Sequence, residues 1–272
     1  MGTTGAGRLP SMHARSALFD VYGDHLRTRG HRAAVADLVR LLDPIGIAAP
    51  AVRTAISRMV SQGWLEPATV EGHRGYAATP QAIRRLEEAA DRIYRRRDDH
   101  WDGCWQLLLL DPFPSRAVRA AVLRDLPYLG YAALDDRVWV SPWVRADLVE
   151  TLGRAGATAT TARALDFDPF DSPTRAWDLD AIGTEYAAWL DAASSSVEAH
   201  LDAHPDPDEA AFAARFHLVH EWRKFLFTDP GLPDQLLPDD WAGRRASDYF
   251  RREADRLATA SEAFVARTLS PA

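Results

Sequence analysis

The sequence has a single cysteine, Cys104, among its 272 residues. One thiol excludes an internal disulfide framework and any zinc finger built on cysteine ligands. Lysine is equally scarce: Lys224 is the only one, so 31 of the 32 basic residues are arginines. Long apolar runs are missing as well. None approaches the roughly 18–20 residues that cross a bilayer, and residues 1–9 hold no apolar segment of a secretory signal. We therefore expect a cytoplasmic protein without a membrane partner.

Motifs of the common nucleotide-binding and hydrolase sites are also absent from the sequence. It contains no P-loop, no glycine-rich dinucleotide turn and no serine-centred nucleophile elbow. Hydrophobic residues make up 47% and charged residues 26%, which is near the average of globular proteins and argues against a largely disordered chain. The length exceeds the usual 100–200 residues of one domain, so two or three domains are expected.

The charges that are present divide unevenly along the chain. Residues 1–85 hold 11 arginines and 6 acidic residues, whereas the rest of the chain accounts for the overall net charge of −7 by a large excess of acids. A basic head on an acidic body suggests that the head binds an anion, and nucleic acid is the obvious candidate.

Apolar side chains at helical spacing predict three helices in the basic head, at residues 14–28, 35–42 and 51–62. A candidate hairpin follows, with strands at 68–70 and 75–78 and a tip at 71–74. Three helices followed by a two-stranded hairpin is the order of a winged helix-turn-helix. With the helix that begins after Thr79-Pro80, this domain is assigned to residues 13–97.

The third helix carries a polar face opposite its apolar stripe. No acid lies on this face to pair with its arginines, and the surrounding module is net basic. Arginine can bind guanine with two hydrogen bonds in the major groove, while serine and threonine suit phosphates or base edges. An ordinary solvated helix face is the alternative, but the pattern favours DNA contact. The residues are Arg53, Thr54, Ser57, Arg58 and Ser61.

The hairpin supplies a second group of candidate DNA contacts: His73, Arg74 and Tyr76. A wing contacts phosphates or the minor groove, which requires a cation and a hydrogen-bond donor. An exposed turn without a ligand is the alternative reading. Three further arginines could add phosphate contacts, and the sequence does not rank them: Arg15, Arg29 and Arg32.

Residues 101–168 show a different pattern. Extended segments are expected at 105–110, 131–134, 138–140 and 158–165, with helices after Ser115 and at 144–155. The resulting order β-α-β-β-α-β is the ferredoxin-like split arrangement. Residues 170–269 then read as all-helical, with a helix at 209–227 and a last helix or helix pair at 241–269. The expected fold class is therefore α+β and multidomain.

Several segments, in order along the chain, carry a family resemblance. Residues 51–65 read AVRTAISRMVSQGWL, residues 101–103 read WDG, residues 138–142 read VWVSP and residues 218–224 read LVHEWRK. Together they resemble the PaaX family, repressors of phenylacetate catabolism, over about residues 13–255. The resemblance implies a winged helix, a Cas2-like ferredoxin fold and a helical C-terminal domain. It also implies a homodimer that binds palindromic operator DNA and is released by an aryl-acyl-coenzyme A.

The segment of the third domain that resembles the PaaX family, residues 218–224, holds the candidate ligand residues. An apolar wall beside fixed positive charge would suit an aryl-acyl-coenzyme A, with its ring packed and its phosphates paired. Plain core packing of the aromatics Trp222, Phe225 and Phe227 is the alternative. His217, His220 and Glu221 have a spacing that could bind a metal, but they lack the pattern of hydrolytic zinc sites, and we predict none. The predicted ligand-binding residues are His220, Trp222, Arg223 and Lys224.

The sequence is thus interpreted as a ligand-responsive transcriptional repressor that is not an enzyme and needs no cofactor. One alternative is a metal-dependent nuclease or RNA-processing protein that uses the Cas2-like domain, in which an acid near Asp111 would hold the metal. The other is a ligand sensor whose winged helix makes protein contacts.

Overall fold

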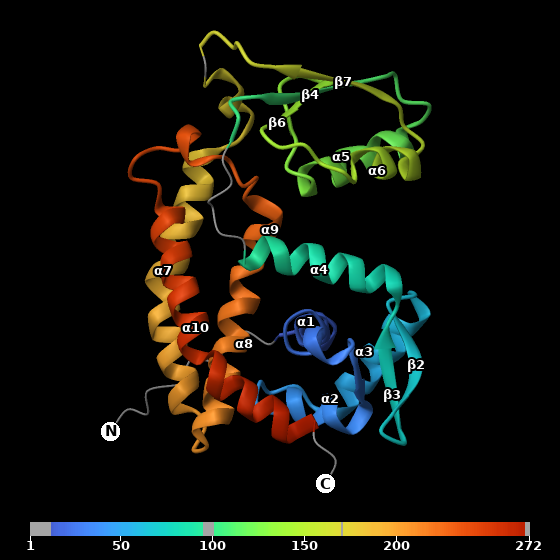
Figure 1. Ribbon diagram of the computed structural model, residues 1–272, viewed down its shortest axis with the longest axis vertical. Helices are drawn as coiled ribbons and strands as arrows, with labels where there is room; N and C mark the ends of the chain where they lie inside the picture. The colour runs from blue at the N-terminus through green and yellow to red at the C-terminus, as the bar shows by residue number, and fades with distance from the viewer. Residues whose placement is uncertain (1–11, 95–100, 170, 270–272) are drawn as a thin grey trace, which may run out of the picture. The chain divides into compact units, whose positions relative to one another are not determined.

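The computed structural model describes residues 12–94, 101–169 and 171–269 (Figure 1). The chain divides into two compact units, and neither is continuous in sequence. The first unit comprises Met1–Tyr94, Ala192–Trp222 and Tyr249–Ala272, and the second comprises Arg95–Asp191 and Arg223–Asp248. Residues of the predicted helical domain therefore lie in both units. The mixture of helices and sheets confirms the α+β multidomain class.

The first unit begins with a helix that changes its geometry. The α-helix α1 covers Ala14–Asp20 and continues as a π-helical turn, η1, over Val21–His25. A 3₁₀ turn, η2, over Arg27–Arg29 ends at Gly30, whose φ of 69° suits glycine. The prediction of one regular helix over 14–28 is therefore wrong. A Cβ at Gly23 would lie 3.2 Å from a Leu86 methyl group, so the irregular turn lies where another helix packs closely.

Two further helices and a sheet complete the head. Helix α2 covers Val35–Leu42, as predicted, and α3 covers Ala49–Ser61. Strands β1 (Arg32–Ala34), β2 (Leu65–Val70) and β3 (His73–Ala78) form an antiparallel sheet in the order β1-β3-β2. Strand β1 was not predicted, because three residues are too few to show an alternating pattern.

The hairpin turn is tighter than the sequence suggested. Glu71 and Gly72 alone form it, with φ angles of 50° and 81°, as a two-residue turn between twisted strands requires. The predicted tip at 71–74 is wrong, because His73 and Arg74 already belong to β3. Gly75 is needed at its position, since a Cβ there would lie 2.5 Å from the carbonyl oxygen of Ala33.

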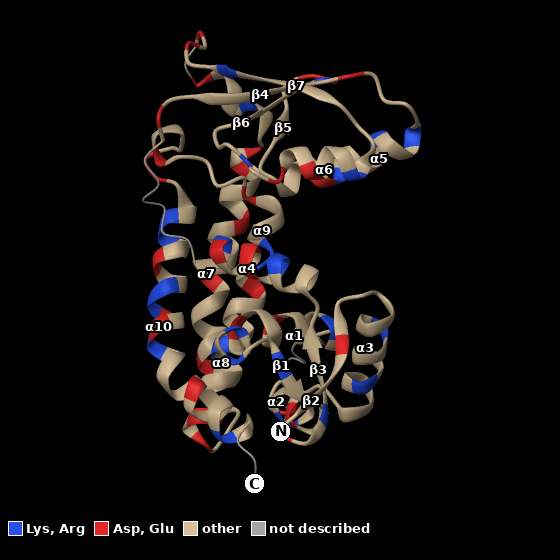
Figure 2. Cartoon of the chain, turned by 45° about the vertical axis from the view of Figure 1, so that its right-hand side comes forward, with Lys and Arg blue, Asp and Glu red and all other residues tan. Residues whose placement is uncertain are grey.

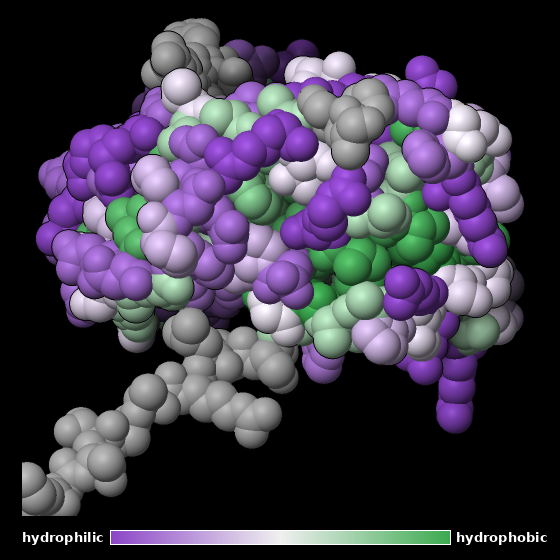
Figure 3. Space-filling model, turned by 90° about the horizontal axis from the view of Figure 1, so that it is seen from below, coloured by the Kyte–Doolittle hydropathy of each residue, from purple (hydrophilic) through white to green (hydrophobic). Residues whose placement is uncertain are grey.

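One hydrophobic core joins the head to the C-terminal helices. It includes Leu18, Leu38 and Ile56 of the head together with Phe212 and Phe216 of helix α8 (Pro207–Trp222). Helix α10 (Ala242–Leu269) adds Phe264 and Val265, and α4 (Pro80–Tyr94) adds Ala82 and Leu86. Full burial of a leucine, isoleucine, valine or phenylalanine side chain contributes about 1.5–3 kcal/mol to the stability of the fold. On the face shown in Figure 3, hydrophilic side chains are frequent and hydrophobic ones gather mainly toward the right.

The second unit contains the predicted β-α-β-β-α-β order. Its elements are β4 (Trp105–Leu110), α5 (Arg116–Tyr128), β5 (Ala132–Ala133), β6 (Val138–Ser141), α6 (Leu148–Ala155) and β7 (Ala159–Ala164). The sheet order is β5-β6-β4-β7, with every neighbouring pair antiparallel. Helices α5 and α6 pack on one face of it through Val122 and Leu152 (Figure 1). As predicted, Ser115 caps α5: its Oγ accepts a hydrogen bond of 3.2 Å from the amide of Val118.

The remaining elements are helical and differ from the predictions at their ends. They are η3 (Ser172–Ala176), α7 (Leu179–Asp202), α9 (Phe225–Thr228) and η4 (Asp234–Leu236), in addition to α8 and α10. The predicted helix at 209–227 ends at Trp222, and the predicted helix at 144–155 starts only at Leu148. Within the described residues, no helix has the length and apolar character needed to span a membrane.

Candidate nucleic-acid interface

Helix α3 separates an apolar and a polar face, as its sequence pattern predicted. Val52, Ile56 and Met59 are buried in the core of the first unit. Pro50 occupies the first turn, where its missing amide hydrogen costs no helical bond, and Ala48 at the N-cap position makes no side-chain hydrogen bond. All five predicted contact residues of this helix are exposed on its other face: Arg53, Thr54, Ser57, Arg58 and Ser61.

The arginines of α3 differ from others in the head in their ion pairing. Arg27 pairs with Asp91 at 3.3 Å, Arg40 pairs with Asp37 at 2.5 Å, and Arg29 pairs with Glu262. Among the residues that the structure describes, Arg53 and Arg58 form no ion pair. Figure 2 shows basic segments and no acidic one along α3. The charges of Arg53 and Arg58 therefore face solvent, where an external anion can bind them.

Two hydroxyl groups of α3 are fixed by the helix backbone. Thr54 Oγ1 donates to the carbonyl of Pro50 at 2.9 Å, and Ser61 Oγ donates to the carbonyl of Arg58 at 2.8 Å. Each hydroxyl oxygen keeps its acceptor capacity while its hydrogen is occupied. In this arrangement both side chains suit donors, such as the amino groups of bases, better than phosphate oxygens.

The three wing residues have unequal surroundings. His73 and Arg74 are exposed, whereas Tyr76 is 8% exposed and belongs to the core. The Tyr76 hydroxyl accepts a hydrogen bond from Arg74 Nη2 at 3.0 Å, and its carbonyl accepts one from the Tyr22 hydroxyl at 2.9 Å. Burial raises the pKa of Tyr22, so this phenol stays a donor at neutral pH. Tyr76 thus anchors β3 and orients Arg74.

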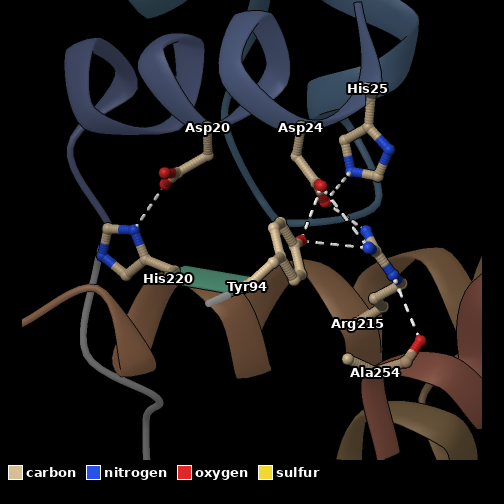
Figure 4. A network of polar contacts seen from close by, with 7 residues as sticks. All are labelled: Asp20, Asp24, His25, Tyr94, Arg215, His220 and Ala254. Atoms are coloured by element: carbon tan, nitrogen blue, oxygen red, sulfur yellow. Dashed lines mark hydrogen bonds and ion pairs between the residues drawn. The ribbon is translucent and has the colours of Figure 1, made fainter. Parts of the chain in front are cut away.

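A partly buried polar junction joins the head to the C-terminal helices of the first unit (Figure 4). The carboxylate of Asp24 accepts hydrogen bonds from the Tyr94 hydroxyl at 2.6 Å and from both terminal nitrogens of Arg215. Arg215 Nη2 also donates to the Tyr94 oxygen at 3.1 Å, and its Nε donates to the carbonyl of Ala254 at 3.4 Å. Four elements, η1, α4, α8 and α10, therefore meet at a single guanidinium group.

Electrostatics keep this junction ionised. Burial acts to raise the pKa of Asp24, but the electrostatic coupling to the adjacent His25, the charge of Arg215 and the hydrogen bonds from Arg215 and Tyr94 outweigh it and lower the pKa. The same carboxylate raises the pKa of Arg215 despite the burial of that group. Burial lowers the pKa of the neighbouring His25 to about 4, so its imidazole is neutral at pH 7.

The predicted ligand-binding residues do not share one environment. His220 Nδ1 lies 2.7 Å from Asp20 Oδ2 of α1, and Trp222 stacks on Phe250 with ring centroids 4.6 Å apart, both within the first unit. Arg223 and Lys224 belong to the second unit, where the Lys224 ammonium lies 5.0 Å from the centre of the Phe225 ring.

The aromatic wall expected beside these cations is also divided. Phe225 stacks on Tyr186 at 3.9 Å between ring centroids, so it belongs to the core of the second unit. Phe227 is 63% exposed and lies 6.0 Å from the Tyr128 ring. Within the described part of the chain, no group of three His, Cys, Asp or Glu side chains has the geometry of a metal site.

Three family models match successive parts of the sequence. The model of the PaaX-like protein matches residues 13–82, that of the PaaX protein central Cas2-like domain matches residues 98–170, and that of the PaaX-like protein C-terminal domain matches residues 177–267. The chain belongs to the PaaX family.

Individual relatives agree with this assignment to the PaaX family. The chain is 29% identical over 260 residues to the transcriptional repressor PaaX of Escherichia coli (strain K12), covering 92% of this chain and 82% of the relative. The structure is similar to the uncharacterized protein Rv0674 from Mycobacterium tuberculosis, with a TM-score of 0.59 and 23% identity. That similarity covers 95% of this chain and 99% of the other, and it shows the fold alone.

Sequence reasoning about this PaaX-family chain missed the junction of Asp24, Tyr94 and Arg215. Asp24 and Arg215 are 191 positions apart, so no local pattern could connect them. The only local signal was an arginine within a helix, α8, whose other residues are largely apolar and buried on several sides. A charge in the middle of such a helix, between buried apolar residues, requires a partner, although the sequence does not identify it.

Proposed function

We propose that this PaaX-family protein is a sequence-specific transcriptional repressor that binds double-stranded operator DNA through α3 and the β2–β3 hairpin. The observation that carries the proposal is the exposed, acid-free face of α3, on which Arg53 and Arg58 form no ion pair within the described residues. The printed function of the Escherichia coli relative supports it. A non-enzymatic regulator is the corresponding class.

The chemistry of the α3 face suits the major groove of DNA. Arginine can donate two hydrogen bonds to O6 and N7 of guanine, which discriminates this base from the other three. Thr54 and Ser57 are exposed on the same face of α3 as Arg53 and Arg58. Exposed His73 and Arg74 on β3 would contact phosphates beside the groove.

The proposed assembly is a homodimer. One head reads a single half-site, so specific binding to a pseudo-palindromic operator requires two copies in fixed relation. We assign this role to the regions outside the winged helix, residues 101–168 and 170–269, with the head at 13–97 as the DNA-binding domain.

The proposed regulation is release from DNA by an aryl-acyl-coenzyme A in the control of a catabolic operon. A ligand shifts a repressor between two states only if it binds one of them better. Phosphates of such a ligand need cations, and Arg223 and Lys224 are the candidates, with His220 and Trp222 beside them in sequence. The family resemblance supports this ligand class.

The experiment that tests the function measures binding of the full-length protein to fragments of its own promoter. Arg53→Ala and Arg58→Ala should each weaken binding by about 1–3 kcal/mol, roughly 5- to 150-fold, because each removes a base contact. Arg119→Ala on α5 removes a charge that is also exposed but lies far from α3 in sequence, and it is the matched control. Equal affinity of all three variants and the wild type would refute the role of α3.

The same preparation distinguishes the nuclease alternative. Labelled promoter DNA and RNA incubated with the protein and Mg²⁺ should remain intact and only change mobility on binding. Appearance of shorter fragments, lost in an Asp111→Asn variant, would identify a nuclease instead.

A further inference from the structure

A groove runs along the contact between α1 and α3, beside the proposed DNA-reading face. Its volume is about 820 Å³. Ala55 is buried and Phe19 is half-buried, whereas Arg15, Thr54 and Arg58 are exposed. The complete lining is His13, Ala14, Arg15, Ser16, Phe19, Pro50, Ala51, Thr54, Ala55 and Arg58.

The charge of this groove is of one sign. Its lining contains two arginines and one histidine but no aspartate or glutamate. In the described part of the chain, neither Arg15 nor Arg58 is ion-paired. Besides the hydroxyl side chains and Phe19, the lining contains small apolar residues, of which Pro50 and Ala51 are exposed in the first turn of α3. Positive charge beside small apolar surface complements a chain of phosphates joined by sugars.

The aromatic ring in the groove holds Arg15 in place. The Arg15 guanidinium carbon lies 5.4 Å from the centre of the Phe19 ring, within the range of a cation–π contact. Phe19 is itself fixed by an edge-to-face contact with Trp64, with ring centroids 4.7 Å apart at 87°. Arg15 is therefore partly preorganised while its hydrogen-bond donors remain exposed.

The structure also distinguishes Arg15, Arg29 and Arg32, which the sequence offered as equivalent candidates for phosphate contacts. Arg29 pairs with Glu262. Arg29 and Arg32 line a separate pocket of about 330 Å³ together with Asp37 and Glu71, whose negative charges oppose binding of an anion. Arg15 alone of the three lies in a groove lined without an acid.

We propose that the α1–α3 groove binds the sugar-phosphate backbone of the DNA duplex, with Arg15 paired to a phosphate that borders the major groove read by α3. Thr54 and Arg58 line the groove and also belong to the α3 reading face, so the two surfaces are continuous. A phosphate contact here fixes the depth and orientation of α3 without reading sequence. This inference rests on the proposed DNA-binding function and adds α1 to its interface.

The test compares Arg15→Ala, Arg15→Lys and the control Arg32→Ala in the full-length protein. Fluorescence anisotropy would measure affinity for a promoter fragment and for an unrelated duplex between 50 and 200 mM salt, with the thermal midpoint as a folding check. Arg15→Ala should weaken binding to both duplexes by the same factor, about tenfold near 0.1 M salt. It should also reduce the slope of log K against log salt concentration by about 0.9. Arg15→Lys should keep the slope, and Arg32→Ala should leave both quantities unchanged.

Four results would overturn the proposal. If Arg15→Ala keeps the wild-type affinity and salt slope, the groove does not contact the backbone, while the proposed function stands. If the loss is confined to the promoter fragment, Arg15 contacts a base and not a phosphate. If Arg32→Ala loses as much as Arg15→Ala, the effect is one of overall charge. A wild type that binds no promoter fragment refutes the proposed function itself, and the inference with it.

Discussion

Arginines of the first unit occur in two contrasting environments. On α3, Arg53 and Arg58 extend into solvent, and the described residues offer them no acid. On α8, the Arg215 side chain is 13% exposed and contacts Asp24, Tyr94 and the carbonyl of Ala254. An enclosed guanidinium has its donors satisfied within the protein, whereas an exposed one keeps them for an outside acceptor. The same residue type thus supports the fold in one place and a binding surface in the other.

This contrast can be tested most strongly at Arg215. Arg215→Ala leaves the buried carboxylate of Asp24 without its main counter-charge, and loss of one member of a buried pair typically costs about 3–5 kcal/mol. Urea unfolding followed by circular dichroism would measure this loss. Arg215→Met, which keeps much of the apolar length, should be destabilised by a similar amount if charge is the cause. A loss below about 1 kcal/mol in both variants would show that the junction contributes little.

Acidification should reveal a second, smaller effect in the same unit. Burial, together with the positive fields of His200 and His220, lowers the pKa of His217 to about 3, and its ring stacks on His200 with centroids 3.8 Å apart. The unfolded state therefore takes up protons at a higher pH than the folded state. The free energy of unfolding should fall as the pH drops below about 6.5, by up to about 1.4 kcal/mol per pH unit for each such histidine.

The measurement is a series of urea unfolding curves between pH 7.5 and 4.5. His217→Gln should make the pH dependence shallower by close to one proton. An unchanged slope in His217→Gln would contradict the assignment of the low pKa to this residue.

The smallest effect on the free energy of unfolding is expected for the exposed arginines of α3. Arg58→Ala should change the free energy of unfolding by less than about 0.5 kcal/mol, because it removes an exposed side chain without an acid partner in the described residues. The same variant loses DNA affinity under the proposed function. Thermal unfolding of the wild type and Arg58→Ala side by side would detect any larger cost, which would place Arg58 in the fold and not in the interface.

The sequence predicted the elements whose signals are local. Helix α2 and strand β4 have the predicted bounds because their apolar spacing is regular from end to end. The polar face of α3 was predictable for the same reason, since one helix fixes which of its residues point together. The order of elements in the second unit also follows from local patterns joined by short turns.

Features that depend on distant partners could not be predicted in this way. No local pattern connects Asp24 to Arg215, and only the fold brings the two side chains together. Trp222 and Phe225 are three residues apart in sequence, yet α8 ends at Trp222 and the two rings pack in different units. Tyr76 was chosen as a wing contact from its place in a hairpin, but the core of the first unit covers its ring, whereas Arg74, nearer to the turn, stays exposed.

The single core of the first unit has a consequence for how the protein is made. The head supplies residues up to Tyr94, but Phe212, Phe216, Phe264 and Val265 complete its core, and Glu262 holds Arg29. Synthesis proceeds from the N-terminus, so a ribosome must release almost the whole chain before the head has all its packing partners. Truncated chains that end before α10 would lack these contacts. The surface that carries α3 would then mature last, although it is encoded first.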